Sequence, residues 1–462
     1  MTSPQPFSLL LSLFGDPEMN AILSLDETVR GWLRAEAALA EAQCAADLLS
    51  ADATAAIVRA AVPESIDMDA LLASARNVGY PILPLVRMID AAAGSAGQGR
   101  VHLGATTQDI MDTGLALQLQ RAAARLQQLT QALGDALALL VERERDTVMA
   151  ARTHAQQAVP TTFGAKIAVF LGEVTRHRER LTSAAERVAF VSLHGAGGTS
   201  AALGERAAEV RASMAQRLGL RASAVPWHVA RDGIAELGQV SAQLAATTAR
   251  LGREVVALSR TEIGELAERE GHHRGASSTM PQKTNPIGSE AAIGMAIAAG
   301  ATSAALLRAM EAGHERAAGE WQVEWHVLPQ VLALSAGALA TAGEVARELQ
   351  VRRDAMRSNA GDGRGLIMAE AYMMRLAPTL GRERAHDLVY EAAQQARGDG
   401  LDLEGALRAV GRARGIAQLA ALEPLGPEDH LGQTGAACAE ALAAWHAPGG
   451  DAPAALASRE AS

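Results

Sequence analysis

The sequence predicts an all-α protein whose middle part is a bundle of five long helices. Apolar residues make up 49% of the 462 residues, whereas aromatic residues make up only 3%. The apolar majority is therefore alanine, leucine and valine, a composition that suits packed helices better than sheets. Apolar residues also recur at helical spacing over long segments, and short polar loops containing glycine and proline separate these segments.

The clearest helical pattern runs from Arg231 to about Glu262. In this segment Leu237, Leu244, Leu251 and Leu258 recur every seven residues, with Ile234 and Val255 at the partner positions. This spacing predicts an apolar seam on one helix of about 30 residues. A second long helix is predicted after Asp112, where leucines step by three and four residues along one face: Leu126, Leu129, Leu133, Leu137 and Leu140.

Three more long helices are predicted near 165–190, 286–312 and 326–350, the last bent at Pro329. Five such helices exceed what one bundle monomer needs, and each has apolar residues beyond a single stripe. We therefore expect some helix faces to be buried against other subunits; the alternative is one elongated monomeric bundle.

Shorter and more broken patterns flank these helices and predict two smaller helical domains. The expected division is 1–111 for an N-terminal domain, 112–360 for the central bundle and 361–462 for a C-terminal domain, with Gly361–Gly363 at the second boundary. The tail after Pro448 is rich in proline, glycine, alanine and serine and is expected to fray.

Composition also narrows the class of partner. The net charge of −10 argues against a nucleic acid, although a local cationic pocket would still accept an anionic small substrate. Cys44 and Cys438 form no disulfide framework and no zinc spacing, which favours a reducing cytoplasm. The apolar run Leu9–Phe14 is too short for a signal peptide, and no run approaches the ~18 apolar residues of a membrane span. A soluble cytoplasmic protein without a membrane partner is expected.

Three polar stretches interrupt the helical pattern: Val101–Thr113, Arg152–Gly164 and Gly271–Glu290. Each lies at the end of a predicted long helix, where polar loops held by rigid elements often carry binding or catalytic residues. The first contains His102, Thr106, Thr107 and Asp109, and the second contains Thr153 and His154. A lone histidine is more often structural than catalytic. The adjacent pair His272 and His273 has no third ligand at a suitable spacing, so no metal is expected.

The third stretch combines Ser277, Lys283 and Asn285 with a helix start. Asn285 is a helix-capping residue type, and Pro286 after it suits the first helical position. The loop is thus expected to lead into a helix N-terminus whose free N–H groups and dipole favour anions, with Lys283 adding a positive charge. A serine alkoxide or a substrate carboxylate would be stabilised there. The alternative is a mobile polar linker in front of a capped helix.

The segment from Gly275 to Pro286 (GASSTMPQKTNP) resembles the signature loop of the fumarase/aspartase superfamily. Its members include fumarase, aspartase, argininosuccinate lyase, adenylosuccinate lyase and 3-carboxy-cis,cis-muconate cycloisomerase. His102–Thr113 and Thr153–Gly164 resemble the other two signature regions in the expected order, so the resemblance covers essentially the whole chain. It implies a homotetramer with a twenty-helix core, five helices per subunit, and active sites shared by three subunits.

The resemblance also implies roles for individual residues. Ser277 matches the catalytic serine that exchanges a proton at the carbon α to a carboxylate; His154 matches the histidine of the second region, and Glu290 the acid that pairs with it. The expected substrate-binding residues are His102, Thr106, Thr107, Thr153, Lys283, Asn285 and, as an additional carboxylate contact, Arg316. No metal or organic cofactor is implied.

Other segments are similar to the cycloisomerase branch: Phe14–Asp16, Pro226–Asp232, His314–Pro329 and Arg364–Glu370. This similarity implies lactonisation of 3-carboxy-cis,cis-muconate, a small polycarboxylate, in the protocatechuate (β-ketoadipate) route of aromatic catabolism.

The alternative function is a fumarate-releasing C–N lyase of the adenylosuccinate or argininosuccinate lyase type. His154 and Glu290 favour it, because some cycloisomerases have tryptophan where this chain has His154. Gln282 is similar to the argininosuccinate lyase loop, and Ala276 replaces the family's usual glycine. A non-catalytic structural relative is a third alternative, against which the retained site residues argue.

Overall fold

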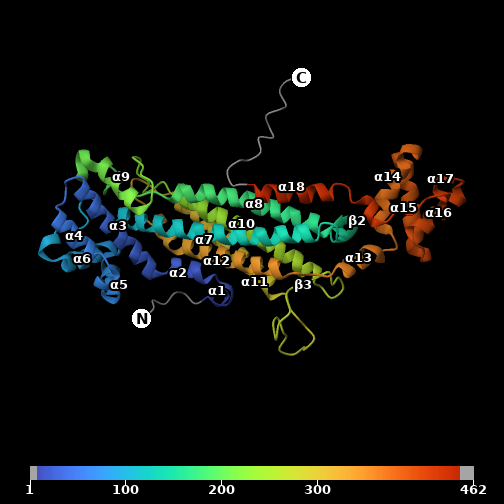
Figure 1. The fold of residues 1–462 in the computed structure, drawn as a ribbon, viewed down its shortest axis with the longest axis horizontal. Helices are drawn as coiled ribbons and strands as arrows, with labels where there is room; N and C mark the ends of the chain where they lie inside the picture. Colours follow the sequence, from blue (N-terminus) through green and yellow to red (C-terminus); the bar gives the residue numbers. More distant parts are fainter. Residues whose placement is uncertain (1–7, 448–462) are drawn as a thin grey trace, which may run out of the picture. The chain divides into compact units, whose positions relative to one another are not determined.

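The computed structural model describes residues 8–447 and confirms the all-α prediction. The five long helices are α7 (Thr107–Arg143), α8 (Phe163–Val188), α10 (Asp232–Leu258), α11 (Ile287–Ala309) and α12 (Glu320–Glu348) (Figure 1). The tail after Pro448, which was expected to fray, lies outside the described residues.

The predicted helices are all present, but their ends differ from the sequence estimates. On α10 the four leucines of the heptad are buried, and the helix ends at Leu258 rather than near Glu262. Helix α7 begins at Thr107, before the expected start after Asp112. Helix α12 begins at Glu320 rather than near 326 and continues through Pro329.

The chain forms two compact units. The first contains residues 1–130, 177–249 and 291–340, and the second contains 131–176, 250–290 and 341–462. Long helices contribute segments to both units, so the boundaries fall inside helices. The three-domain division at 111 and 360 is a different partition of the chain and remains a proposal.

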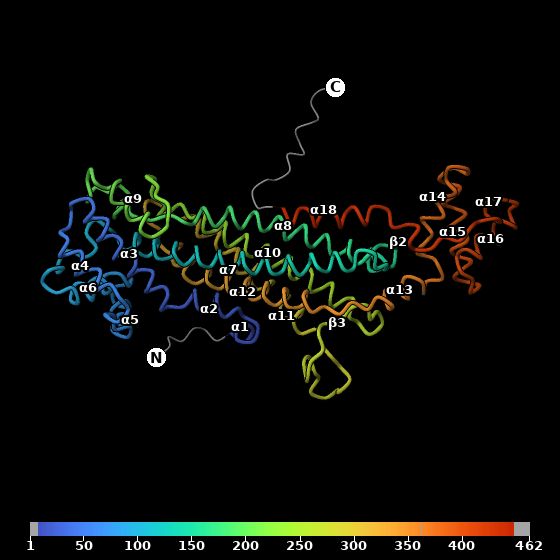
Figure 2. The backbone as a smooth tube through the Cα atoms, in the orientation of Figure 1, coloured from blue at the N-terminus to red at the C-terminus, as the bar shows by residue number. Residues whose placement is uncertain are grey.

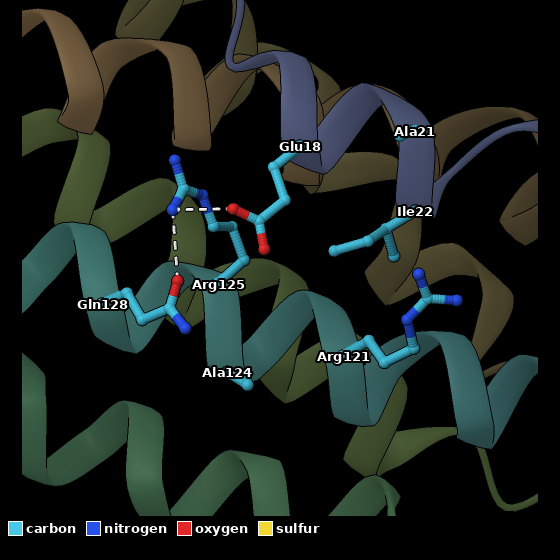
Figure 3. A pocket seen from close by; sticks show the side chains of 7 residues that line it. All are labelled: Glu18, Ala21, Ile22, Arg121, Ala124, Arg125 and Gln128. Carbon is cyan, nitrogen blue, oxygen red and sulfur yellow. Dashed lines mark hydrogen bonds and ion pairs between the residues drawn. The ribbon is translucent and has the colours of Figure 1, made fainter.

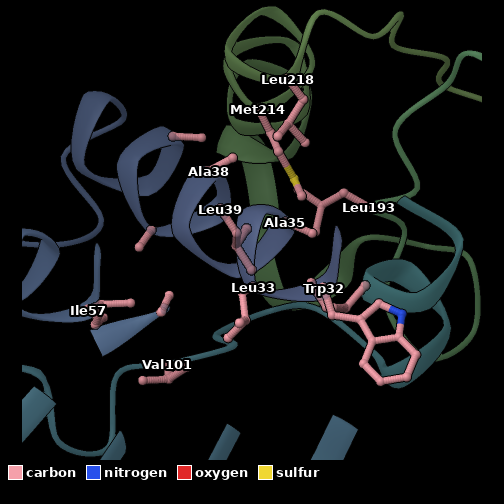
Figure 4. Packing of buried hydrophobic residues seen from close by; sticks show 14 of the residues in the cluster. Trp32, Leu33, Ala35, Ala38, Leu39, Ile57, Val101, Leu193, Met214 and Leu218 are labelled. Carbon is pink, nitrogen blue, oxygen red and sulfur yellow. The ribbon is translucent and has the colours of Figure 1, made fainter. Parts of the chain in front are cut away.

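Short helices make up much of the first unit. Helix α3 (Leu25–Ala45) packs against α4 (Ala51–Ala60) and α9 (Ala207–Leu218), and α4 packs against α6 (Ile82–Gly97). Figure 4 shows part of the resulting core, in which Leu39 of α3 and Met214 of α9 are buried together. The unit also contains α1 (Leu9–Phe14), α2 (Pro17–Ile22), α5 (Met68–Val78) and the short helical turns η1 (Pro63–Ser65) and η2 (Ala201–Arg206).

Two glycines allow α3 and α7 to cross closely. A Cβ atom added to Gly114 of α7 would lie 2.7 Å from the Trp32 ring and 3.2 Å from the backbone of Gly31 on α3. Because real Cβ atoms do not make contacts this short, a side chain at Gly114 would push the two helices apart. The crossing brings the first turns of α7 against α3.

The second unit contains a β-hairpin that the sequence did not predict. Strands β1 (Val148–Thr153) and β2 (Gln156–Thr162) pair antiparallel, and β3 (Leu266–Ala267) pairs with β4 (Gln350–Val351). Helix α13 (Arg353–Asp362) packs against β1, and the turns η3 (Leu366–Met368) and η4 (Pro427–His430) contact β2. The remaining helices are α14 (Ala369–Leu380), α15 (Arg382–Asp399), α16 (Leu403–Arg414), α17 (Ala417–Ala420) and α18 (Thr434–His446).

Helices α11 and α12 are the described helices that come nearest to a membrane span. By length and mean hydropathy both would be long and apolar enough to cross a membrane, although polar residues and glycine interrupt both, and neither is the uninterrupted apolar run that the sequence prediction excluded. Leucine, valine, isoleucine and alanine together supply this hydropathy, and such helices also occur in the cores of proteins that do not enter membranes. Of the apolar window in α12, 72% is buried within the chain, compared with 39% in α11.

The exposed side of α11 is an apolar stripe. Ile297, Gly300, Ala301, Ala304 and Leu307 are all exposed and are spaced by three or four residues, so they lie on one helix face. We call these five residues the α11 stripe. The exposed Arg308 lies on the same face, four residues after Ala304, and bounds the stripe, but the five residues before it are contiguous along the helix, unlike scattered surface leucines.

Candidate active site

The signature loop is closed at its base by backbone contacts. The Asn285 N–H donates to the Gly275 carbonyl at 2.8 Å, and Ala276 forms an isolated bridge with Thr284. Gly275 has a φ of +67°, and a Cβ there would lie 2.4 Å from the Asn285 oxygen, so glycine is required for this closure. Figure 2 shows the loop, between β3 and α11, as a long excursion away from these two elements.

Ser277 lies just inside this base and is half-buried. Its Oγ accepts hydrogen bonds from the Met280 N–H at 3.1 Å and, more weakly, from the Thr279 N–H at 3.3 Å. Donors directed at an oxygen favour its anionic form over its protonated form. The turn that follows Ser277 therefore provides what a serine acid or base needs, namely stabilisation of its alkoxide.

The helix start after the loop differs from the sequence prediction. Helix α11 begins at Ile287, and its Gly288 and Ser289 N–H groups donate to the two carboxylate oxygens of Glu268 at 3.1 and 2.7 Å. The expected free anion site is thus occupied by the protein's own carboxylate, whose side chain is 6% exposed. Among the described residues no α11 N–H group is bonded to the Asn285 side chain, so Glu268 takes the capping role assigned to Asn285.

The other predicted residues of the loop and of α11 face outward to different extents. Lys283 and Glu290 are exposed, whereas Asn285 is half-buried. The Lys283 N–H donates to the Met280 carbonyl, which keeps its backbone close to the turn after Ser277.

His154 occupies the tip of the unpredicted hairpin. Thr153 pairs with Gln156, so His154 and Ala155 form a two-residue turn, with φ of +50° and +61°. A type I′ turn requires positive φ at both positions and usually contains Asn-Gly. Neither His154 nor Ala155 is of this type, and both, like Thr153, are exposed. Strained positions of this kind are concentrated at functional sites, where the surrounding structure holds them in place.

The strand before this turn is anchored by a buried ion pair. Arg152 donates two hydrogen bonds to Glu265, at 2.9 and 2.5 Å, and Asn359 of α13 donates to the same carboxylate at 2.8 Å. The Glu265 side chain is fully buried. This arrangement fixes β1 two residues before His154.

His102, Thr106 and Thr107 lie in the first unit, at the start of α7. Thr106 directly precedes the helix, and its N–H donates to Asp109 Oδ2 at 3.0 Å, which is one half of a capping box. His102 adopts a φ of +66°, and its Nδ1 lies 2.6 Å from Oε1 of Glu36 on α3.

Asp109 connects several loops of the first unit; the sequence placed it in the first polar stretch but assigned it no role. Its carboxylate also accepts hydrogen bonds from His228 Nε2 at 2.8 Å, from the Ser192 hydroxyl and from the N–H groups of His194 and Gly195. Burial alone would raise the pKa of Asp109, but His228 and the two N–H groups hold it below its ordinary value. Asp109 therefore stays ionised and orders the loops around Thr106.

Arg316 lies beside the start of α7. It donates to the Gln108 side-chain oxygen at 2.9 Å and to the Ala196 carbonyl at 3.0 Å. The structure thus groups Arg316 with the Thr106–Thr107 segment in the first unit. The other predicted residues all belong to the second unit: Thr153, His154, Ser277, Lys283, Asn285 and Glu290. Among the described residues, no hydrogen bond or ion pair joins His154 to Glu290.

A surface groove of about 220 Å³ lies elsewhere in the first unit, between α2 and α7 (Figure 3). No predicted site residue lines it. Its Arg125 is bonded to Glu18 and Asp16, and Arg121 is bonded to Glu27, so the cations in this groove are already paired.

Glu36 was not considered in the sequence interpretation, although it contacts the candidate residue His102. Glu36 carried a recognisable signal, because it lies on the buried stripe of α3 together with Val29, Trp32 and Leu39. A charged residue on an apolar stripe is rare without a partner.

Comparison with known proteins shows which family the sequence matches. A family model described as lyase matches residues 17–299, and one described as adenylosuccinate lyase C-terminus matches residues 365–441. The 3-carboxy-cis,cis-muconate cycloisomerase of Pseudomonas aeruginosa is 42% identical over 439 residues, which cover 93% of this chain and 95% of that protein. Trans-aconitate decarboxylase 1 of Mycosarcoma maydis is 38% identical and covers 84% of this chain and 78% of its own length.

A solved structure is similar over nearly the whole chain. The crystal structure of 3-carboxy-cis,cis-muconate lactonizing enzyme from Pseudomonas putida has a TM-score of 0.87 and 36% identity, and it covers 95% of this chain and 98% of its own. Sequence and fold therefore point to the same group of proteins.

Proposed function

The chain belongs to the lyase family known as the fumarase/aspartase superfamily, and on this premise we propose that it is a lactonising 3-carboxy-cis,cis-muconate cycloisomerase. In this reaction a carboxylate oxygen of the substrate adds to the conjugated double bond. The electron pair moves onto the neighbouring carboxylate, and a proton is then delivered to the carbon α to it, which gives 4-carboxymuconolactone.

Ser277 is the proposed proton donor, and the geometry of its Oγ carries the proposal. When the hydroxyl gives up its proton, the N–H groups of Met280 and Thr279 already point at the alkoxide that forms. Donors that are in place before the reaction need no reorganisation in the transition state, which makes them effective. Lys283 and Asn285 are proposed to stabilise the doubly negative carboxylate, and loop closure would exclude water.

The remaining residues are proposed to bind substrate or to assist proton transfer. His154 and Glu290 are proposed as a catalytic pair. Thr106, Thr107 and Thr153 would donate hydrogen bonds to carboxylates, and His102 and Arg316 would supply positive charge. Three carboxylates need several donors, which agrees with the similarity to relatives whose names denote two different tricarboxylates. A cytoplasmic location and the aromatic-catabolic role belong to the same proposal.

The substrate assay tests the reaction itself. Purified protein given 3-carboxy-cis,cis-muconate is expected to bleach the ultraviolet absorbance of the diene, because lactonisation removes one of the two conjugated double bonds. Persistent absorbance with folded protein would remove the cycloisomerase proposal and leave the family assignment intact.

A fumarate-releasing C–N lyase is the second candidate, favoured by the retained His154 and Glu290 and by the adenylosuccinate lyase C-terminus match. Release of fumarate from a succinyl-amine, in protein that leaves the diene unchanged, would favour this candidate.

We also propose that the protein is a homotetramer with active sites shared between subunits. The α11 stripe supports this, because an apolar helix face of this extent is normally covered by a partner. Such a partner is available in a second copy of the chain.

Replacing Ala304 in the middle of the stripe with arginine is expected to break the assembly, since the new charge would be buried in the interface. Sedimentation velocity measures the mass of the particle. The matched control is Ala55→Arg, at an exposed alanine of α4, which should keep the native mass. A wild-type protein that sediments as a monomer at micromolar concentration would contradict the tetramer.

A further inference from the structure

Glu36 is a fully buried carboxylate with one hydrogen-bond partner among the described residues. Its Oε1 contacts Nδ1 of His102 at 2.6 Å, and its Oε2 has no partner. A buried carboxylate is costly unless a charge or several donors compensate it. The imidazole of His102 is the group placed to do so, and it does so best when it is protonated.

The His102 loop is held by α3 at two points. Gln43, seven residues after Glu36 and on the same helix face, donates to the Leu103 carbonyl at 2.6 Å. Glu36 fixes the ring through Nδ1, and within the described structure Nε2 makes no hydrogen bond. The His102 side chain is 19% exposed, so solvent or a ligand can reach it. The ring is therefore oriented from behind, with one N–H left for another molecule.

We propose that Glu36 is a positioning residue that keeps His102 as an imidazolium, whose Nε2–H binds one carboxylate of the substrate. The identity of that substrate rests on the proposed function. An imidazolium with Nδ1 already engaged offers a single charged donor, and a carboxylate is the acceptor that gains most from it. Glu36 itself does not touch the substrate.

The electrostatics of the pair agree with this assignment. Burial lowers the pKa of His102, but the charge and hydrogen bond of Glu36, together with the charge of Asp109, raise it above its ordinary value of 6.5. Glu36 from α3 and Asp109 from α7 are the charged groups acting on the ring. The charged form therefore persists to higher pH than in a free histidine, and KM for the anionic substrate should rise as pH passes through the raised pKa.

The pair also affects stability in a defined pH range. Because the pKa is raised in the folded protein, the stabilisation is fully present below the ordinary histidine value. It is lost as pH rises through the raised pKa.

The test is Glu36→Gln, which keeps the shape and removes the charge. We expect the titration midpoint of His102, followed by NMR of ¹³Cε1-labelled histidine, to fall, since burial then acts without the opposing carboxylate. At neutral pH, KM and the Kd of tricarballylate, a saturated tricarboxylate, should each rise about ten-fold, the scale of one charge-assisted hydrogen bond, with a smaller change in kcat.

The matched control is Gln43→Leu, which loosens the same loop without changing any charge. It should leave the His102 midpoint where it is in the wild type. An unchanged His102 midpoint in Glu36→Gln would overturn the inference. A wild-type midpoint at or below 6.5 would also overturn it, and this measurement does not depend on the folding of a variant. Failure of wild-type turnover with a raised midpoint would instead remove the proposed reaction and leave the pair standing. Failure of tricarballylate to bind the wild type would remove the carboxylate ligand.

Discussion

Ser277→Ala is expected to lower kcat by at least ~10²-fold, the scale of a lost acid/base group, with the assembly intact. The variant removes the oxygen to which the Met280 and Thr279 N–H groups donate, so the proposed proton donor is lost from the loop. Diene bleaching measures turnover, and sedimentation measures assembly. KM should change less than kcat, because the lost interaction belongs to the transition state.

Ser278→Ala is the matched control, because Ser278 is the neighbouring serine and is exposed. Among the described residues, its hydroxyl accepts no hydrogen bond from a backbone N–H group. It should retain turnover within a few-fold of the wild type. Near-wild-type turnover in Ser277→Ala, or equal losses in the two variants, would contradict the role assigned to Ser277.

The helices with a clean apolar repeat were predictable, and their ends were not. The leucine heptad of α10 specified a buried seam whatever its neighbours were. The first turns of α7 and α12 were missed because they bury Asp109 and Glu324, polar residues that look like loop residues until their partners His228 and Arg231 are known. Those partners lie about a hundred residues away in the sequence.

The hairpin around His154 was missed for a local reason. Its turn is His-Ala rather than Asn-Gly, and Gln156–Thr162 does not alternate between apolar and polar residues. Only the surrounding contacts, such as Arg152 with Glu265, explain why this chain turns there.

The candidate site was predictable as a set of segments but not as a set of contacts. Ser277 was identified from its loop, yet the anion site expected at the start of α11 is filled by Glu268, which lies 20 residues before Gly288. Glu36 was hidden in an alanine-rich helix where nothing marked its partner. The polar loops could thus be singled out from the sequence as candidate site segments, whereas the supporting carboxylates required the fold.

Two of the segments that resembled the cycloisomerase branch, Pro226–Asp232 and His314–Pro329, meet at a buried ion cluster in the first unit, together with Asp112 of α7. Arg231 donates two hydrogen bonds to Asp112 of α7, at 2.8 and 3.1 Å, and two to Glu324 of α12, at 2.8 and 2.6 Å. All three side chains are 1% exposed. Burial alone would lower the pKa of Arg231, but the two carboxylates hold it above its ordinary value, so the cation is permanent.

Arg231→Met is therefore expected to destabilise the protein by about 3–5 kcal/mol, because it leaves two buried carboxylates without their cation. The thermal unfolding midpoint, measured at fixed protein concentration, should fall well below that of the wild type. The matched control is Arg187→Met. Arg187 also makes a two-point ion pair, with Glu236, but both partners are exposed, so its loss should barely move the midpoint.

A triple variant separates the cost of unpaired charge from the loss of attraction. Replacing the cluster with apolar residues of similar size, as Asp112→Leu, Arg231→Met and Glu324→Met, leaves no buried charge and should recover most of the lost stability. If the triple variant were as unstable as Arg231→Met alone, the attraction itself, rather than the uncompensated carboxylates, would account for the loss. The cluster would then be a net source of stability for the first unit, in addition to a geometric link between α7, α12 and Arg231, the residue before α10.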